Sequence, residues 1–160
     1  MIAIPWYIAL FVGVPEAYFM IILGFKLFNL KINYTYPLIV AVASATVAYF
    51  IRQLSIEFGI HTFLCLVLMV FLCRLLTKEK LWFIFVSILT GFVIVGFLES
   101  IIMLLGFYIT SMNYSAIALN PWLHLVFFLP ELLILLIIYY FVNKYDFYIY
   151  SLESKEYENF

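Results

Sequence analysis

The first long apolar segment of the chain, IPWYIALFVGVPEAYFMIILGF at residues 4–25, contains Glu16 near its centre. A helix of about 20 apolar residues is long enough to cross the ~30 Å hydrocarbon layer of a bilayer. A carboxylate near mid-depth costs about 2.5–3.5 kcal/mol on insertion scales, and such residues are functional by default. The segment therefore predicts a membrane helix that carries a polar group inside the lipid layer.

A second segment, NPWLHLVFFLPELLILLIIYYF at residues 120–141, repeats the pattern of the first. Each segment opens with a Pro-Trp pair and carries a Pro-Glu pair at mid-depth, formed by Pro15 and Glu16 in the first and by Pro130 and Glu131 in the second. The repeat predicts two acidic side chains at similar depth in the membrane.

The composition extends this reading to the whole chain. Hydrophobic residues make up 68% of the 160 residues, against roughly 45–50% in soluble domains. In lipid the backbone must satisfy its hydrogen bonds within each segment, which requires helices. We predict an all-α integral membrane protein with a membrane domain over residues 1–142 and a short cytoplasmic tail over 143–160. Its five predicted helices cover residues 4–25, 37–54, 60–76, 81–106 and 120–142.

The positive charges predict the orientation, because cytoplasmic segments of membrane proteins are enriched in lysine and arginine. With the N-terminus outside and the C-terminus in the cytoplasm, Arg52 is the one basic residue on the outer side. The inner segments then hold all the others: Lys26, Lys31, Arg74, Lys78, Lys80, Lys144 and Lys155.

Small residues indicate where the predicted helices approach each other closely. Ser87 and Gly91 lie four residues apart, a spacing that lets helices pack tightly in lipid. Ordinary packing within one bundle explains this pattern better than a dedicated dimer face. Cys65 and Cys73 are interpreted as packing residues, and Asn113 begins a sequence that fits a glycosylation sequon.

Four charged residues define the predicted ligand- or proton-binding site: Glu16, Glu131, Glu99 and Arg52. A lone ionised carboxylate is too costly in a low dielectric, so each must be neutral, hydrogen-bonded or paired. We expect Arg52 to pair with Glu99 in the outer leaflet, and Glu16 and Glu131 to share a central polar cavity. Candidate hydroxyl partners are Tyr18, Tyr49 and Tyr108.

Three further polar residues, Glu57, His61 and His124, are assigned to the outer face as a secondary group. Nothing ties either histidine to a third ligand at a spacing that metals require, so no metal site is expected. A structural interpretation of the buried charges also stands, because an Arg–Glu pair can fix helix register and a membrane proline can simply kink its helix.

Several classes of function are not expected. The net charge of −1 and the absence of a basic stripe argue against nucleic-acid binding. The sequence lacks nucleotide-binding and hydrolase motifs, and its single aspartate, Asp146, lies beyond the last predicted helix. We therefore expect a protein without catalytic activity or cofactor.

Several short motifs resemble a known family. They are Tyr-Phe-Ile-Arg at residues 49–52, Phe-Gly-Ile-His-Thr at 58–62, GFVIVGFLE at 91–99 and Asn-Pro-Trp-Leu at 120–123, together with the Pro-Glu pair of the first segment. Together they are similar to the N-terminal membrane regions of Gram-positive sensor histidine kinases of the accessory-gene-regulator and sporulation type. In that family a phospho-accepting helix and an ATP-binding domain follow, and this sequence contains neither. The resemblance implies a sensing module in a bacterial plasma membrane, without the kinase.

The sequence thus predicts a sensory or regulatory membrane module that responds to a small ligand, a cation or protonation. The signal would pass through the C-terminal tail to a cytoplasmic or membrane partner, or within a homo-oligomer. One alternative is a small ion- or proton-coupled transporter or channel subunit, and another is an accessory subunit whose glutamates meet arginines of another chain.

Overall fold

A computed structural model describes residues 5–53, 59–77, 79–111, 120 and 122–151. Its described elements are helical: α1 (Trp6–Ile8), a π-helical turn η1 (Ala9–Gly13), α2 (Val14–Leu27), α3 (Thr35–Gln53), α4 (Ile60–Thr77), α5 (Leu81–Thr110) and α7 (Trp122–Lys144). The first three form one continuous span, Trp6–Leu27, so five helices are long and apolar enough to cross a membrane. The predicted all-α fold with five membrane-length helices is confirmed.

The main difference from the predicted boundaries concerns α5. It continues through Gly106, the residue at which the sequence predicted its end, to Thr110. The residues after Gly106 are largely apolar, and the Thr110 hydroxyl donates a hydrogen bond of 2.7 Å to the Gly106 carbonyl within the helix. A single glycine costs a helix only about 1 kcal/mol, so it does not have to end one. The helix ends instead at Ser111, whose φ of 53° is left-handed.

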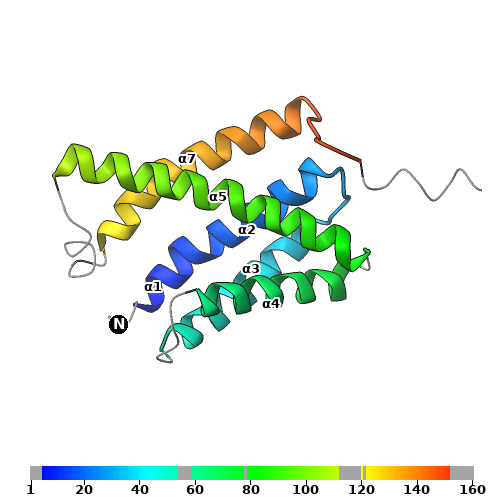
Figure 1. Cartoon of the computed structure of the whole chain (residues 1–160), viewed down its shortest axis with the longest axis horizontal. Helices are drawn as coiled ribbons and strands as arrows, with labels where there is room; N and C mark the ends of the chain where they lie inside the picture. Colours follow the sequence, from blue (N-terminus) through cyan, green and yellow to red (C-terminus); the bar gives the residue numbers. More distant parts are fainter. Residues whose placement is uncertain (1–4, 54–58, 78, 112–119, 121, 152–160) are drawn as a thin grey trace, which may run out of the picture.

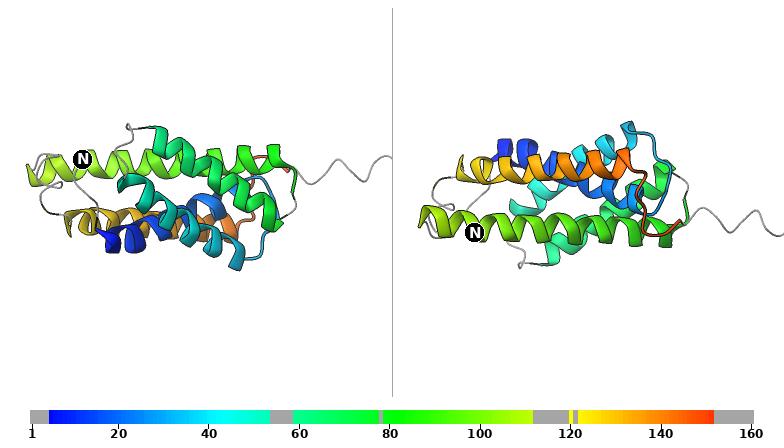
Figure 2. Two further views of the ribbon diagram at one scale, coloured as in Figure 1. Left: turned by 90° about the horizontal axis from the view of Figure 1, so that it is seen from below. Right: turned by 90° about the horizontal axis from the view of Figure 1, so that it is seen from above.

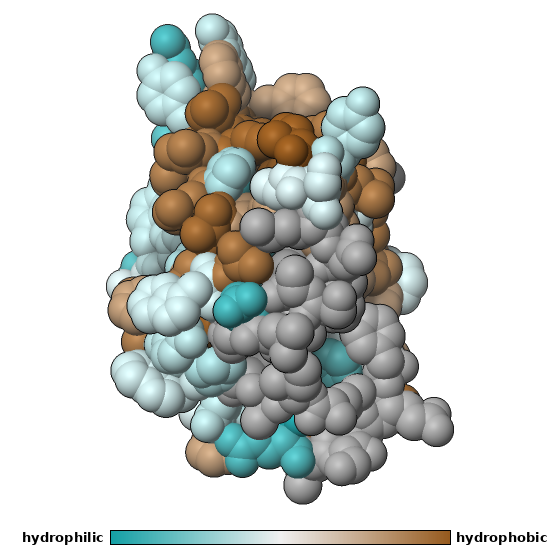
Figure 3. All heavy atoms as spheres, turned by 90° about the vertical axis from the view of Figure 1, so that its left-hand side faces the viewer, coloured by the Kyte–Doolittle hydropathy of each residue, from teal (hydrophilic) through white to brown (hydrophobic). Residues whose placement is uncertain are grey.

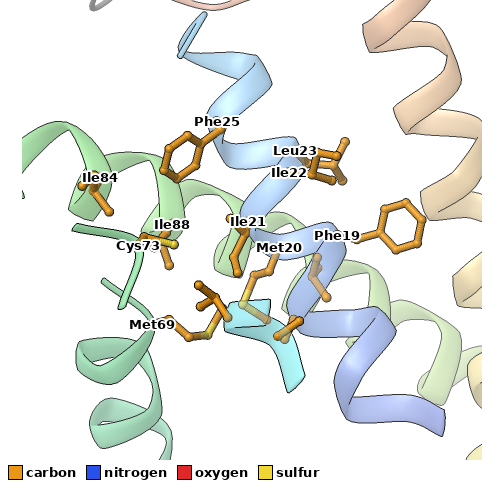
Figure 4. Close-up of a cluster of buried hydrophobic side chains, with 14 of the residues drawn as sticks. Phe19, Met20, Ile21, Ile22, Leu23, Phe25, Met69, Cys73, Ile84 and Ile88 are labelled. Carbon is orange, nitrogen blue, oxygen red and sulfur yellow. The ribbon is translucent and has the colours of Figure 1, made fainter. Parts of the chain in front are cut away.

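The helix α2 is the centre of the bundle (Figures 1 and 2). It packs against α3, α5 and α7, while α4 packs between α3 and α5. This arrangement explains why α2 contains the most completely buried run of the chain: Ile21, Ile22, Leu23 and Phe25, each with no exposed surface. In Figure 4, Ile21 and Phe25 lie toward Ile88 of α5, whereas Phe19 points toward α7, where its ring lies 6.3 Å from that of Tyr139.

Two glycines allow α2 and α5 to approach each other. A Cβ atom on Gly24 would collide with the backbone carbonyl of Ser87, and one on Gly91 would collide with that of Met20. Each glycine therefore receives the backbone of the other helix, as small residues do in membrane helix pairs. The predicted close packing at Ser87 and Gly91 is present, and its partner is α2.

The outer helices direct large apolar side chains away from the core. Exposed examples are Phe63 on α4, Phe97 on α5 and Leu133 on α7. Figure 3 views the end of the bundle where α5 ends and α7 begins, and apolar side chains cover much of its described upper part. An apolar exterior around an apolar core is expected when lipid is the solvent. The structure thus supports a multi-pass membrane protein in contact with lipid.

Aromatic residues gather toward both ends of the bundle. Tyr7 and Trp122 stack at one end with their ring centroids 5.2 Å apart. At the other end, Trp82 stacks on Phe85 at the start of α5, and Tyr145 stacks on Phe141 at the end of α7. Aromatic residues at both boundaries of the hydrocarbon layer are typical of membrane proteins.

Candidate functional site

Pro15 alters the helix geometry of the first span next to Glu16. A proline in a helix donates no backbone hydrogen bond, and its ring collides with the carbonyl four residues earlier. The π-helical turn Ala9–Gly13 ends two residues before Pro15 and widens the helix at that point. We attribute this turn to the proline. Turns of this kind occur frequently at functional sites, and here the turn sets which side of the span Glu16 occupies.

The second Pro-Glu pair behaves differently. Pro130 lies inside the continuous helix α7 and is itself exposed. The neighbouring Glu131 points into the bundle and is only 4% exposed. The local helix geometry around the two glutamates therefore differs, although the sequence pattern of the two Pro-Glu pairs is the same.

The glutamates converge on one small cavity between α2, α5 and α7. Its polar lining consists of Glu16, Glu99, Glu131 and His124, and its apolar lining consists of Val12, Ile102, Met103, Phe127 and Phe128. The cavity volume is about 20 Å³, which is enough for one water molecule. Glu16 and Glu131 thus lie on a common cavity, and Glu99 and His124 join them.

Glu131 is the most constrained polar group in this cavity. Its Oε1 atom is fully buried and has no hydrogen-bond partner among the residues that the structure describes. A buried polar atom without a partner is unusual and calls for an explanation such as a bound water, an ion or a functional role. The cavity that Glu131 lines provides room for such an occupant.

The three carboxyl groups also influence one another electrostatically. Glu16 interacts with both Glu99 and Glu131, and Glu131 interacts with Glu99. Glu131 is buried and Glu16 half-buried, whereas Glu99 is exposed. Ionised carboxylates that line one cavity repel one another, so each charge makes the next less favourable. The arrangement is therefore suited to holding and exchanging a proton.

Arg52 lies at the end of its helix, as the sequence predicts, but it does not form the expected ion pair with Glu99. It is exposed at the end of α3, and its charge acts on Glu16 and Glu99. Within the described residues, no ion pair of 4.0 Å or less joins Arg52 to Glu99. The expected pair is absent because α3 packs on α2 and α4, whereas Glu99 lies on the part of α5 that faces α7.

The residues assigned to the outer face separate into different environments. His124 lines the cavity together with the glutamates, whereas the sequence predicted it at the outer face. It lies two turns before Glu131 on α7, and this spacing along one helix face could have revealed it. His61 is half-buried at the start of α4, beside the hydroxyl of Thr62 at 3.2 Å, and does not line the cavity. Glu57 lies outside the described residues, as does Asn113 of the sequon.

The remaining predicted groups do not contribute to the cavity. None of the expected hydroxyl partners, Tyr18, Tyr49 and Tyr108, is among its lining residues. Cys73 is buried and Cys65 half-buried within α4, in agreement with their interpretation as packing residues. A search of the described histidine, cysteine and acidic side chains finds no group of three or more arranged to hold a metal ion.

Comparison with known proteins finds no family model that matches the chain, no curated protein similar in sequence and no solved structure similar in fold. The likeness to the membrane regions of sensor kinases therefore rests on the short sequence motifs alone.

Proposed function

We propose that the protein is a membrane sensory or regulatory module whose input is protonation of the acidic cavity. The observation that carries the proposal is the buried, unpartnered Oε1 of Glu131, in a cavity that it shares with Glu16 and Glu99. The space is adequate for a water molecule and too small for a metabolite. Among the inputs that the sequence left open, a small ligand, a cation or a proton, the cavity is best suited to a proton.

The output signal would pass through the C-terminal ends of α2 and α7, which lie away from the cavity. Lys26 of α2 donates a hydrogen bond of 2.8 Å to the side chain of Asn143 on α7. After α7 the chain returns to α2, where the Ile149 amide donates a hydrogen bond of 2.8 Å to the Leu27 carbonyl. The helices that carry Glu16 and Glu131 are thus joined a second time, by hydrogen bonds at and after the end of α7. A change in their relative position at the cavity would move the C-terminal segment.

Such a switch requires the proton to bind one arrangement of the helices more tightly than another. Adding a proton to the cluster removes repulsion between carboxyl groups on three helices, so it favours their closer approach. In the proposed orientation the N-terminus is outside and the C-terminus is cytoplasmic in a bacterial plasma membrane. The positive-inside bias supports this orientation, and the C-terminal segment would then contact a cytoplasmic or membrane partner.

Distance measurements between paired spin labels test this proposal. Cysteines replace two exposed residues, Leu81 and Tyr148, in a protein in nanodiscs that lacks its native cysteines. We expect the distance distribution to change between acidic and alkaline buffer, and the change to be lost in Glu131→Gln. Glu79→Gln is the matched control, because it removes the same charge from a carboxylate outside the cavity. A response that survives Glu131→Gln would contradict the proposal.

A proton-coupled transporter is the second candidate, because transporter sites also lie near mid-membrane between helices. Proton flux into proteoliposomes distinguishes the two functions. Flux that Glu16→Gln and Glu131→Gln both abolish would favour transport. Absence of flux, together with the pH-dependent distance change, would favour sensing.

A further inference from the structure

A second and larger cavity lies near the other end of α7. It is an open groove of about 410 Å³, within the range of about 300–1,000 Å³ that is typical of ligand sites. Its walls come from the last turns of α7 and from the residues that follow the helix: Ile137, Ile138, Phe141, Val142, Tyr145 and Phe147. The lining is entirely apolar or aromatic.

The groove exists because the chain reverses direction after α7. Asp146 adopts a left-handed conformation with a φ of 44°, and the Phe147 amide then donates a hydrogen bond of 3.1 Å to the Val142 carbonyl. A further hydrogen bond joins Ile149 to Leu27 of α2. These bonds fix Phe147 opposite the helix, so the groove is a formed feature of the backbone.

Positive charge lies at the same end of the bundle. The Lys144 ammonium group is 5.5 Å from the centre of the Tyr140 ring and 5.8 Å from that of Tyr145, which itself lines the groove. Lys26 is held nearby through its hydrogen bond to Asn143. Asp146 is the one carboxylate in the described part of the segment that follows α7.

We propose that this groove binds an acyl chain of one anionic phospholipid, whose phosphate group interacts with Lys144. An apolar groove bordered by a lysine matches the two parts of such a lipid, namely a hydrocarbon chain and a negative headgroup. Basic pockets between membrane helices are known to select anionic headgroups. Aromatic rings beside the lysine are suited to the headgroup level of a bilayer. A zwitterionic lipid would fill the groove equally well and carries the same phosphate, but its own ammonium group offsets that charge, so it would gain less from the lysine.

Native mass spectrometry of the purified protein tests this proposal. The protein is mixed with phosphatidylglycerol or phosphatidylcholine that carry identical chains. We expect preferential retention of phosphatidylglycerol, and Lys144→Gln to reduce that retention roughly fivefold, as the loss of one lysine near an anionic surface predicts. Asp146→Asn should raise it, because a repulsive charge is removed.

Two variants separate the roles of charge and groove. Lys80→Gln is the matched control, because Lys80 also lies over an aromatic ring, at 5.7 Å from the centre of Phe83, but at the start of α5. It should leave retention unchanged. Ile138→Trp, which fills the groove, should reduce retention of both lipids. Equal retention of the two lipids by the unmodified protein, or equal effects of Lys144→Gln and Lys80→Gln, would overturn the proposal.

Discussion

At the scale of single residues, Glu131 is the side chain that apolar packing explains least. Its side chain is 4% exposed, and its Oε1 has no protein partner among the described residues. A buried polar atom without a partner costs about 1–3 kcal/mol. Proteins keep such groups where function needs them, at the expense of stability.

Replacing Glu131 by leucine should therefore stabilise the protein. Leucine has a similar size and leaves no buried polar atom, so we expect the free energy of unfolding to rise by about 1–3 kcal/mol. The measurement is the apparent Tm in detergent. Glu131→Gln, which keeps a polar group in place, should produce a smaller change. A lower Tm for Glu131→Leu than for the unmodified protein would show that the carboxyl group has a structural partner.

The sequence indicated the position of each polar residue along its helix but not the direction in which its side chain points. Glu16 and Glu131 could be predicted because each follows a proline near the middle of a membrane-length apolar segment. The pairing of Arg52 with Glu99 was wrong because it relied on equal depth, while α3 packs on helices other than α5 at that level. His124 was named as a candidate but grouped with the outer-face residues, because its place near a helix start gave no sign that it faces the same cavity as Glu131.

At the scale of helices, the contact between α2 and α5 depends on two glycines. Gly24→Ala or Gly91→Ala would place a methyl group against the backbone of the other helix. Backbone cannot yield as a flexible side chain does, so we expect each substitution to destabilise the protein by about 1–3 kcal/mol or more. Thermal unfolding in detergent, followed by circular dichroism, measures this effect.

Gly96 provides a control on the same helix as Gly91. A Cβ atom there meets nothing within 4 Å, and alanine is the better helix former. Gly96→Ala should therefore be neutral or slightly stabilising. If it were as harmful as Gly91→Ala, close packing would not be the reason for the glycine at position 91.

Helix existence was more predictable than helix detail. Hydropathy located all five membrane-length helices, because lipid requires long apolar segments whatever their neighbours are. The π-helical turn Ala9–Gly13 and the continuation of α5 to Thr110 could not be read from hydropathy. Both features depend on local backbone hydrogen bonds. Apolar side chains are compatible with a π-helical or an α-helical backbone, and with a shorter or a longer helix, so hydropathy does not distinguish them.

At the scale of the whole molecule, the proposed orientation makes a direct prediction. In a protein whose native cysteines are replaced, Asn29→Cys lies after α2 and Gly59→Cys lies before α4, at opposite ends of the bundle. We expect a membrane-impermeant maleimide to label Gly59→Cys in intact cells, and Asn29→Cys only after the membrane is opened. The reverse pattern would place the N-terminus in the cytoplasm and remove the basis for a cytoplasmic output.

The central place of α2 has a consequence for biogenesis. The ribosome makes α2 before α5 and α7, the helices that complete the walls around Glu16. During translation Glu16 therefore enters the bilayer before its later neighbours exist. The protonated, neutral side chain then has the lowest free-energy cost in the lipid. The acidic cavity is complete only after α7 has been inserted. A chain arrested earlier would therefore expose a carboxyl group to lipid. Membrane quality control would have a chemical feature by which to recognise such incomplete molecules.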